Sequence, residues 1–403
     1  MHSLPIWRKR LILSRMVATT SSGKTDMKIL TGTTAAEKPD PYKMVTAVVN
    51  NGGPNPWAQL LQLLGYVIRG TGVRPGDYYK HGFWMRDIDP AFRKELVPKS
   101  RKHAYNGALM MPGLGLKSDV IEDKIATEVL LRKHGFSTSL TLAVYGGEDS
   151  AAHVEHLNDV DDIVEFLTRS ENPPLFAKPR SGSLAAGSIA IQGLARDGVN
   201  LVLTNGVEVS PRALAEEIVT DWPAGYTFQK LYRSERTLQR HSGMAMASLR
   251  IVTLLTDRGV EPFNAVMRFP SATAMHDGAS LNTRVWAHIN LEDGKALRVR
   301  AVGKPHLNDL THWQDKDNPV LGYTIPHWDQ AIEICTKAHE LFPGHGILGW
   351  DVFITDDEAL INEINANPND VYQTASGLGL NNPDLKPVYD RAVAYARSKN
   401  GTK

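Results

Sequence analysis

Three oxygen-bearing side chains near the C-terminal end of the chain have the types and spacing of a magnesium site. Asp351 lies in an alternating stretch, Trp350 to Thr355, which is typical of a half-buried strand. Two aspartates favour a turn after it, and Leu360 to Asn365 is predicted to be the returning strand. Glu363 and Asn365 share one face of that strand, and pairing in register places Asp351 across from them. Two carboxylates and an amide suit Mg2+, which prefers oxygen ligands, although a surface hairpin with solvated acids has the same pattern.

A second stretch has the features of a phosphate-binding hairpin. A short apolar strand ends at Lys178, small residues fill the loop from Ser181 to Gly187, and Ser188 to Ile191 is predicted to be the returning strand. A loop of small residues lets backbone N–H groups approach phosphate oxygens, and the lysine adds a point charge. The pattern is not a Walker motif, because GxxxxGK[ST] is missing. A flexible hairpin without a ligand is the alternative. The predicted phosphate-binding residues are Lys178, Ser181, Gly182, Ser183 and Gly187.

Two arginines lie inside apolar stretches that are predicted to be strands. Arg250 belongs to Ser248 to Thr256, and Arg268 belongs to Pro262 to Phe269. An arginine among apolar strand residues is costly unless its charge is paired. Each arginine therefore either points into a cleft and neutralises phosphoryl charge, or pairs with a structural acid.

These motifs occur in the order of a known family. A strand with Asp351, a turn and then E-x-N-x-x-P resembles the metal-binding end of ATP-grasp enzymes, such as D-alanine–D-alanine ligase and glutathione synthetase. More narrowly, GWDVFITDDEALINEINANPNDVYQ, together with ASLRIVT and NAVMRFP, is similar to the sugar-transfer-associated ATP-grasp family and its carboxylate-amine ligase-like relatives. The resemblance covers residues 120–395. It implies an α+β (α/β) ATP-grasp fold, in which two α+β subdomains hold the nucleotide between them.

The resemblance also implies nucleotide contacts outside the motifs above. Lys124 follows Asp123, like the lysine of many ATP-grasp chains that reaches the phosphates; an exposed lysine on the predicted helix 119–134 is the alternative. The strand Gly225 to Tyr232 corresponds to the hinge that binds the adenine edge, although its residues differ from the Glu-Glu-Tyr-Ile-like sequence common in the family. The implied adenine contacts are Gln229, Lys230 and Leu231, and the implied ribose ligand is Glu235.

The resemblance implies ATP-dependent, ADP-forming ligation of a carboxylate to an amine. Asp351, Glu363 and Asn365 would hold Mg2+, with Mn2+ as a substitute, and Arg250 and Arg268 would act as catalytic residues on an acylphosphate. Two alternatives stay open: a kinase-type ATP-grasp enzyme that transfers phosphate and stops, and a nucleotide-binding scaffold without turnover.

The order of the motifs predicts the domain organisation. We expect a flexible or loosely docked N-terminus over 1–45 and an N-terminal or linker subdomain over 46–170. The lid with the phosphate loop is expected over 171–232, and the C-terminal subdomain with the metal site over 233–403. Within the N-terminal part, Met44 to Val49 is predicted to be a strand, Trp57 to Ile68 a helix, and 74–116 irregular.

Composition narrows the class of protein. The chain has 403 residues, of which 42% are hydrophobic and 22% charged, and its net charge is +1, so no global field favours nucleic acid or a membrane. Cys335 is the only cysteine, which excludes an intrachain disulfide and a Cys-based zinc site. No apolar run is long enough for a transmembrane segment. We expect a cytoplasmic enzyme with small-molecule carboxylate and amine partners and no nucleic-acid partner; a homodimer stays open. The basic stretch around Arg8 and Arg15 is expected to be a loosely docked terminus, with an amphipathic segment on an anionic surface as the alternative.

Overall fold

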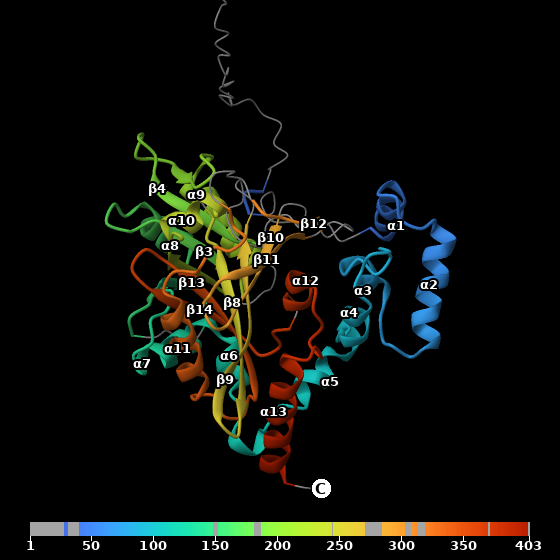
Figure 1. Cartoon of the computed structure of the whole chain (residues 1–403). Coiled ribbons are helices and arrows are strands. Elements are labelled where there is room, and N and C mark those ends of the chain that lie inside the picture. The colour runs from blue at the N-terminus through green and yellow to red at the C-terminus, as the bar shows by residue number, and fades with distance from the viewer. Residues whose placement is uncertain are drawn as a thin grey trace, which may run out of the picture.

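The computed structural model has two seven-stranded sheets with helices packed on them (Figure 1). It describes residues 28–30, 40–147, 152–180, 187–243, 245–270, 284–302, 308–312, 319–369 and 371–401. No helix in these ranges is both long and apolar enough to cross a membrane.

The first sheet has the strand order β2-β1-β7-β3-β4-β5-β6. Its strands are antiparallel except for the parallel pair β1 and β2. Two helices, α8 (Val160–Thr168) and α9 (Pro211–Asp221), pack against each other beside this sheet, and their N-caps are Asp159 and Ser210. The strands are β1 (Thr141–Tyr145), β2 (Glu155–Leu157), β3 (Leu175–Pro179), β4 (Ile189–Leu194), β5 (Leu201–Leu203), β6 (Glu208–Val209) and β7 (Tyr226–Lys230). The sheet therefore starts upstream of residue 171, where we placed the beginning of the lid, and takes two strands from the segment assigned to the linker subdomain.

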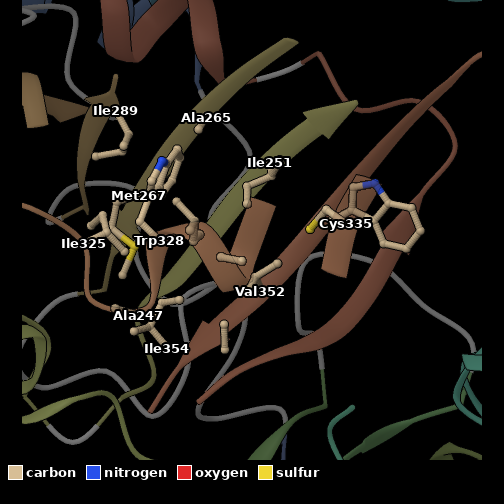
Figure 2. Close-up of a cluster of buried hydrophobic side chains, with 14 of the residues drawn as sticks. Ala247, Ile251, Ala265, Met267, Ile289, Ile325, Trp328, Cys335, Val352 and Ile354 are labelled. Atoms are coloured by element: carbon tan, nitrogen blue, oxygen red, sulfur yellow. The ribbon is translucent and has the colours of Figure 1, made fainter. Parts of the chain in front are cut away.

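The second sheet has the order β12-β11-β10-β9-β8-β13-β14 and is antiparallel throughout. Helix α11 (Trp328–His339) packs on one face, where Cys335 is buried among apolar side chains from β8, β9 and β13 (Figure 2). The buried setting of Cys335 agrees with its predicted role as a small core residue. The strands are β8 (Ser248–Thr256), β9 (Gly259–Phe269), β10 (Arg284–Ile289), β11 (Ala296–Val302), β12 (Asn308–Asp309), β13 (Ile347–Ile354) and β14 (Ala359–Asn365).

The opposite face of the second sheet is covered by two C-terminal helices and one N-terminal helix. Apolar residues of α12 (Tyr372–Ser376) and α13 (Leu385–Asn400) form one core cluster with β8 and β9. Tyr105 of α5 (Lys102–Gly107) belongs to this cluster and stacks on Tyr389 of α13, with ring centroids 3.8 Å apart. The N-terminal part is thereby attached to the second sheet.

The N-terminal part is helical, which corrects two predictions. The predicted strand over Met44 to Val49 is wrong, because these residues lie in α1 (Pro41–Asn50), whose N-cap Asp40 accepts a hydrogen bond from the backbone N–H of Tyr42. A short run with β-branched residues is compatible with a strand or a helix. Here the run follows an aspartate and a proline, which favour the beginning of a helix. The stretch 74–116, predicted to be irregular, forms α3 (Pro75–Lys80), α4 (Pro90–Glu95) and α5. The predicted helix over 57–68 is confirmed as α2 (Pro56–Ile68).

The predicted helix over 119–134 is two helices. Helix α6 (Ser118–Glu122) ends at Asp123, and α7 (Lys124–Lys133) begins directly after it. The Asp123 carboxylate accepts hydrogen bonds from the N–H groups of Ile125 and Ala126, so it caps the new helix. The break places Lys124 in the first turn of α7 instead of in the middle of a long helix.

Two neighbouring chain crossings join the sheets. Before β1, Ser139 donates from its N–H to the Ile361 carbonyl at 3.0 Å, and Ile361 donates to the Ser137 carbonyl at 2.9 Å, so this segment pairs with β14. After β7, the N–H of Glu235, the N-cap of α10 (Arg236–Ser242), donates to the Ile354 carbonyl at 2.9 Å. Residues 137–140 and 231–235 therefore connect the two sheets, and the second of these segments follows the strand that the resemblance assigns to the hinge.

Candidate active site

Alternation along three strands of the second sheet places the site side chains on one face. Ile251 of β8, Met267 of β9 and Val352 of β13 point into the core under α11 (Figure 2). Arg250, Arg268 and Asp351 each lie next to one of these residues and so point to the opposite face. On β14, Glu363 and Asn365 flank Ile364, which also belongs to that core. The strand register pairs Asp351 with Arg250 on one side and with Glu363 on the other, so the predicted register of the hairpin is confirmed.

Both arginines bind the Asp351 carboxylate. Arg250 donates from Nε to Oδ1 at 2.5 Å and from Nη2 to Oδ2 at 3.0 Å, which is the bidentate geometry of a guanidinium and a carboxylate. Arg268 Nη2 lies 2.9 Å from Oδ1. Both Arg250 and Asp351 are buried, with 6% and 5% of their surfaces exposed. The sequence left open whether the arginines pair with an acid or serve the site. Both can be true, because the acid that they pair with, Asp351, belongs to the predicted metal site.

The charges of this cluster determine the protonation of Asp351. Burial by itself raises the pKa of a carboxyl group, but the positive charges and hydrogen bonds of Arg250 and Arg268 outweigh burial and lower the pKa of Asp351 to about 2. Asp351 is thus an anion at neutral pH. Two arginines therefore share this one anion on the face of the sheet.

The oxygens of Glu363 and Asn365 are available to a ligand. Within the described residues, the partly exposed Glu363 carboxylate has no hydrogen-bond or ion-pair partner. The Asn365 amide donates from Nδ2 to Asp351 Oδ2 at 3.4 Å, and its Oδ1 has no hydrogen-bond partner among the described residues. The described residues hold no cluster of three or more His, Cys, Asp or Glu side chains suited to a metal. The donors fit one hard cation that is completed by phosphate oxygens and water, with Glu363 as the uncommitted carboxylate and Asp351 shared with the arginines.

The segment after β14 packs tightly on β13. A Cβ atom at Gly349 would fall inside van der Waals contact of the Pro368 side chain and 3.4 Å from Arg250 Cδ. The Pro368 carbonyl also accepts a hydrogen bond from Arg250 Nη1 at 3.5 Å. Because glycine has no side chain, Pro368 and Arg250 can pack together over residue 349 beside the site.

Replacing Gly349 with alanine should lower the free energy of unfolding by about 1–3 kcal/mol, because the new methyl group must displace Pro368. Chemical denaturation measures this change. Gly76→Ala is the control, because a Cβ at Gly76 meets open space. Equal stability of the two variants would contradict the packing argument.

On the first sheet, Lys124 is held close to the predicted phosphate loop. Its Nζ donates to the Arg180 carbonyl at 3.1 Å, and Arg180 Nη2 binds the Asp123 carboxylate at 2.5 Å. Arg180 directly precedes the predicted loop, whose Ser181, Gly182 and Ser183 lie outside the described residues. Lys178 lies on β3 with its Nζ 5.7 Å from the centre of the Phe176 ring.

Gly187, at the far end of that loop, is required for a structural reason. Its φ is +73°, a conformation that favours glycine, and a Cβ there would clash with the Trp222 ring. The Gly187 carbonyl accepts a hydrogen bond from the Tyr226 hydroxyl. Its contact with phosphate stays a prediction, and so do those of Lys124 and Lys178.

Lys124→Gln should raise the KM for ATP about tenfold or more, because it removes one charge beside the phosphate loop. Lys133→Gln on the same helix is the matched control, since Lys133 is exposed at the other end of α7. Steady-state kinetics at varied ATP would test this expectation, and equal KM values for the two variants would contradict it.

The hinge residues make mainly structural contacts. The Gln229 side chain is buried and donates to Thr141 Oγ1 at 3.1 Å, while the N–H groups of Lys230 and Leu231 donate to the Leu140 and Pro174 carbonyls. Any adenine contact at Lys230 or Leu231 therefore has to use another group than its N–H.

Glu235, the predicted ribose ligand, caps α10. Its carboxylate accepts hydrogen bonds from the N–H groups of Thr237 and Leu238 and from the Tyr323 hydroxyl. These hydrogen bonds compete with a sugar hydroxyl, so the ribose contact stays a prediction.

Sequence reasoning missed the residues that support the site. Ser248 accepts a hydrogen bond from Arg268 Nε at 2.9 Å, and Arg180 orders Lys124. Asn106 of α5 binds the side chains of Asn367 and Asn369, directly after the E-x-N motif. The position of Arg180 before a small-residue loop was a usable signal. The contacts of Ser248 and Asn106 leave no local pattern, because their partners are distant in sequence.

Two sheets are joined by two chain crossings, and the second sheet carries the cluster of Arg250, Arg268 and Asp351. The model of the Sugar-transfer associated ATP-grasp family matches residues 115–388, and the chain belongs to this family. The resemblance seen in the sequence is thereby confirmed, together with the α+β ATP-grasp fold. No curated protein matches the chain.

Several solved structures are similar at low identity. D-alanine–D-alanine ligase from Coxiella burnetii has 15% identity and a TM-score of 0.37, with 70% of this chain and 59% of that chain covered. The ATP-grasp ligase PsnB, complexed with a minimal precursor, has 13% identity and a TM-score of 0.37, with coverages of 70% and 61%. D-alanine–D-alanine ligase from Bacillus anthracis has 13% identity and a TM-score of 0.40, with coverages of 73% and 77%. The chain thus spans less than two thirds of the first two structures.

Proposed function

We propose that this protein is an ATP-dependent ligase that activates a carboxylate as an acylphosphate and joins it to an amine, with release of ADP and phosphate. The observation that carries the proposal is the cluster on the second sheet. Arg250 and Arg268 are both anchored on Asp351, and Glu363 and Asn365 on the same face have carboxylate and amide oxygens without a partner among the described residues. Two arginines beside oxygen atoms that can bind a hard cation suit the transfer of a phosphoryl group between two anions.

The reaction has two steps. An oxygen of the substrate carboxylate attacks the γ-phosphorus of ATP, the bond to the β-phosphate oxygen breaks, and ADP leaves. The amine nitrogen then attacks the acyl carbon, the bond from that carbon to the phosphate oxygen breaks, and the amine loses a proton. Activation is needed because a carboxylate has no good leaving group. No serine or cysteine nucleophile takes part.

The chain's own residues position and neutralise charge. Arg250 and Arg268 would direct their positive charge at the transferred phosphoryl group, and Asp351 holds them in place. Lys124 and Lys178 attract the phosphates from the side of the first sheet. Glu363 and Asn365, with Asp351, would hold Mg2+, for which Mn2+ is the expected substitute; when bound, this ion neutralises the β and γ phosphates.

The test measures ATP consumption with Mg2+ against a panel of amino acids, peptides and sugar acids, and reads the products by mass spectrometry. ADP together with a product lighter by one water than the summed acceptors supports the ligase. Hydroxylamine added to the assay should trap the acylphosphate as a hydroxamate. A phosphorylated acceptor without ligation would favour a kinase-type reaction, and ATP binding with no turnover on any acceptor would favour a scaffold.

We expect the protein to act in the cytoplasm on small molecules.

A further inference from the structure

Helix α2 turns its most apolar face to solvent. It contains no charged residue, and Figure 1 shows it at the outer edge of the molecule, far from the two sheets. Trp57 is 76% exposed and Ile68 is 84% exposed, and the residues between them on this face are exposed as well. The spacing is that of one helical stripe. The stripe, called the α2 stripe below, consists of Trp57, Leu60, Leu61, Leu64, Val67 and Ile68.

The opposite side of α2 faces the protein, where Leu63 and Tyr66 pack against the apolar cluster of the N-terminal helices. Gln59 is buried and accepts a hydrogen bond from the Tyr79 hydroxyl, and Gln62 accepts one from Tyr78. A surface helix normally has polar residues on its outer side, whereas α2 has apolar residues on both sides. A contiguous apolar patch of this kind marks an interaction surface.

The surroundings of the α2 stripe are basic. No aspartate or glutamate occurs between residues 41 and 76, while Lys43, Arg69 and Arg74 lie in this interval. On α1, Tyr42 is exposed as well. Exposed aromatic and aliphatic residues, in a segment that contains cations and no carboxylate, match the interfacial region of an anionic bilayer.

A pocket of about 980 Å³ opens at the C-terminal end of α2. Tyr66 and Arg69 line it together with Arg93, Lys94 and Arg101, and its lining includes no acid among the residues that the structure describes. Arg93 donates from Nη2 to two backbone carbonyls, but its buried Nε has no hydrogen-bond partner among the described residues. The pocket shares no residue with the candidate active site, and it suits an anionic group such as a phosphate.

We propose that α2 docks on an anionic lipid surface, with the stripe in the interface and the basic pocket beside it facing phosphate headgroups. A second copy of this chain could also cover the stripe. In such a dimer, residues 41–76 of one copy would face the same residues of the other. This segment contains cations and no carboxylate, so neither copy could neutralise the positive charge of the other there. An anionic bilayer covers the apolar stripe and neutralises the cations at the same time.

Co-sedimentation of the full chain with vesicles tests the proposal. Vesicles of equal parts phosphatidylcholine and phosphatidylglycerol should retain the protein, and pure phosphatidylcholine should retain it less. The double variant Leu61→Glu/Ile68→Glu should lose binding about tenfold or more, because each change puts a charge in the interface. Val199→Glu/Leu297→Glu is the matched control, since both residues are exposed apolar residues outside α2.

Charge is tested separately with Arg69→Gln/Lys94→Gln, which should weaken binding to the anionic vesicles and leave binding to neutral vesicles unchanged. Circular dichroism checks that each variant is folded. The proposal is overturned if the unmodified chain fails to sediment with anionic vesicles, or if the stripe variant sediments equally well. It is also overturned if light scattering shows a dimer that the stripe variant converts to a monomer while vesicle binding is absent, because a second copy would then cover the stripe.

Discussion

Glu363→Gln should reduce Mg-dependent ATP turnover by about 100-fold or more, while the protein stays folded. The side chain is partly exposed and has no partner among the described residues, so the loss of its charge removes no interaction that stabilises the fold. In the proposed site, Glu363 is the one carboxylate that no arginine neutralises, and an amide is a much weaker ligand for a hard cation. The effect is therefore expected on catalysis and not on stability.

The measurement is ATP turnover with the acceptor identified from the panel, together with Mg-dependent nucleotide binding by calorimetry. Asp357→Asn is the matched control, because Asp357 is an exposed acid in the turn of the same hairpin. The metal assignment would be refuted if Glu363→Gln and Asp357→Asn turned over ATP at the same rate.

Asp351→Asn should lower the free energy of unfolding by about 3–5 kcal/mol and abolish turnover as well. The aspartate is buried and neutralises Arg250, and its removal would leave two guanidinium groups, both largely shielded from water, without their common anion. Loss of turnover follows because the arginines would no longer be held on the face of the site.

Asp309→Asn is the control for this substitution. Asp309 also pairs with two arginines, Arg298 and Arg300, but 55% of its side chain is exposed. Solvent screens the Asp309 carboxylate, and Arg298 and Arg300 each keep a hydrogen bond to a backbone carbonyl, so the loss of Asp309 should cost about 1 kcal/mol or less. Urea denaturation of both variants measures the difference, and similar losses of stability would contradict the dominant role of burial at Asp351.

The same aspartate predicts how stability depends on pH. Its pKa falls from 3.8 to about 2 on folding, so the native state favours the charged form. This stabilisation, about 2 kcal/mol, is fully present above pH 4 and disappears as the pH falls toward 2. In Asp351→Asn this part of the acid dependence should be absent. The free energy of unfolding of both proteins should be measured between pH 2 and 5. If its dependence on pH were the same in both proteins, the assignment to Asp351 would be wrong.

Local patterns were sufficient to predict the elements that carry the site. Alternation predicted β8 and the hairpin of β13 and β14, and the two-residue spacing of Glu363 and Asn365 placed both on one face. These predictions succeeded because a strand alternates strictly, so the face of a side chain follows from its position alone. The same reasoning failed over residues 44–49, where a short apolar run fits a helix or a strand and the cap at Asp40 decided the outcome.

By itself, the sequence determined the family, the order of the motifs and the chemistry of the predicted ligands. Only the tertiary structure decided that Arg250 and Arg268 share Asp351, because this contact depends on β13 pairing with β8 across about a hundred residues of chain. It also decided that Glu235 caps a helix and that α2 exposes its apolar side. Long-range strand order and packing against distant segments set these features, and neither leaves a periodic signal in the residues concerned.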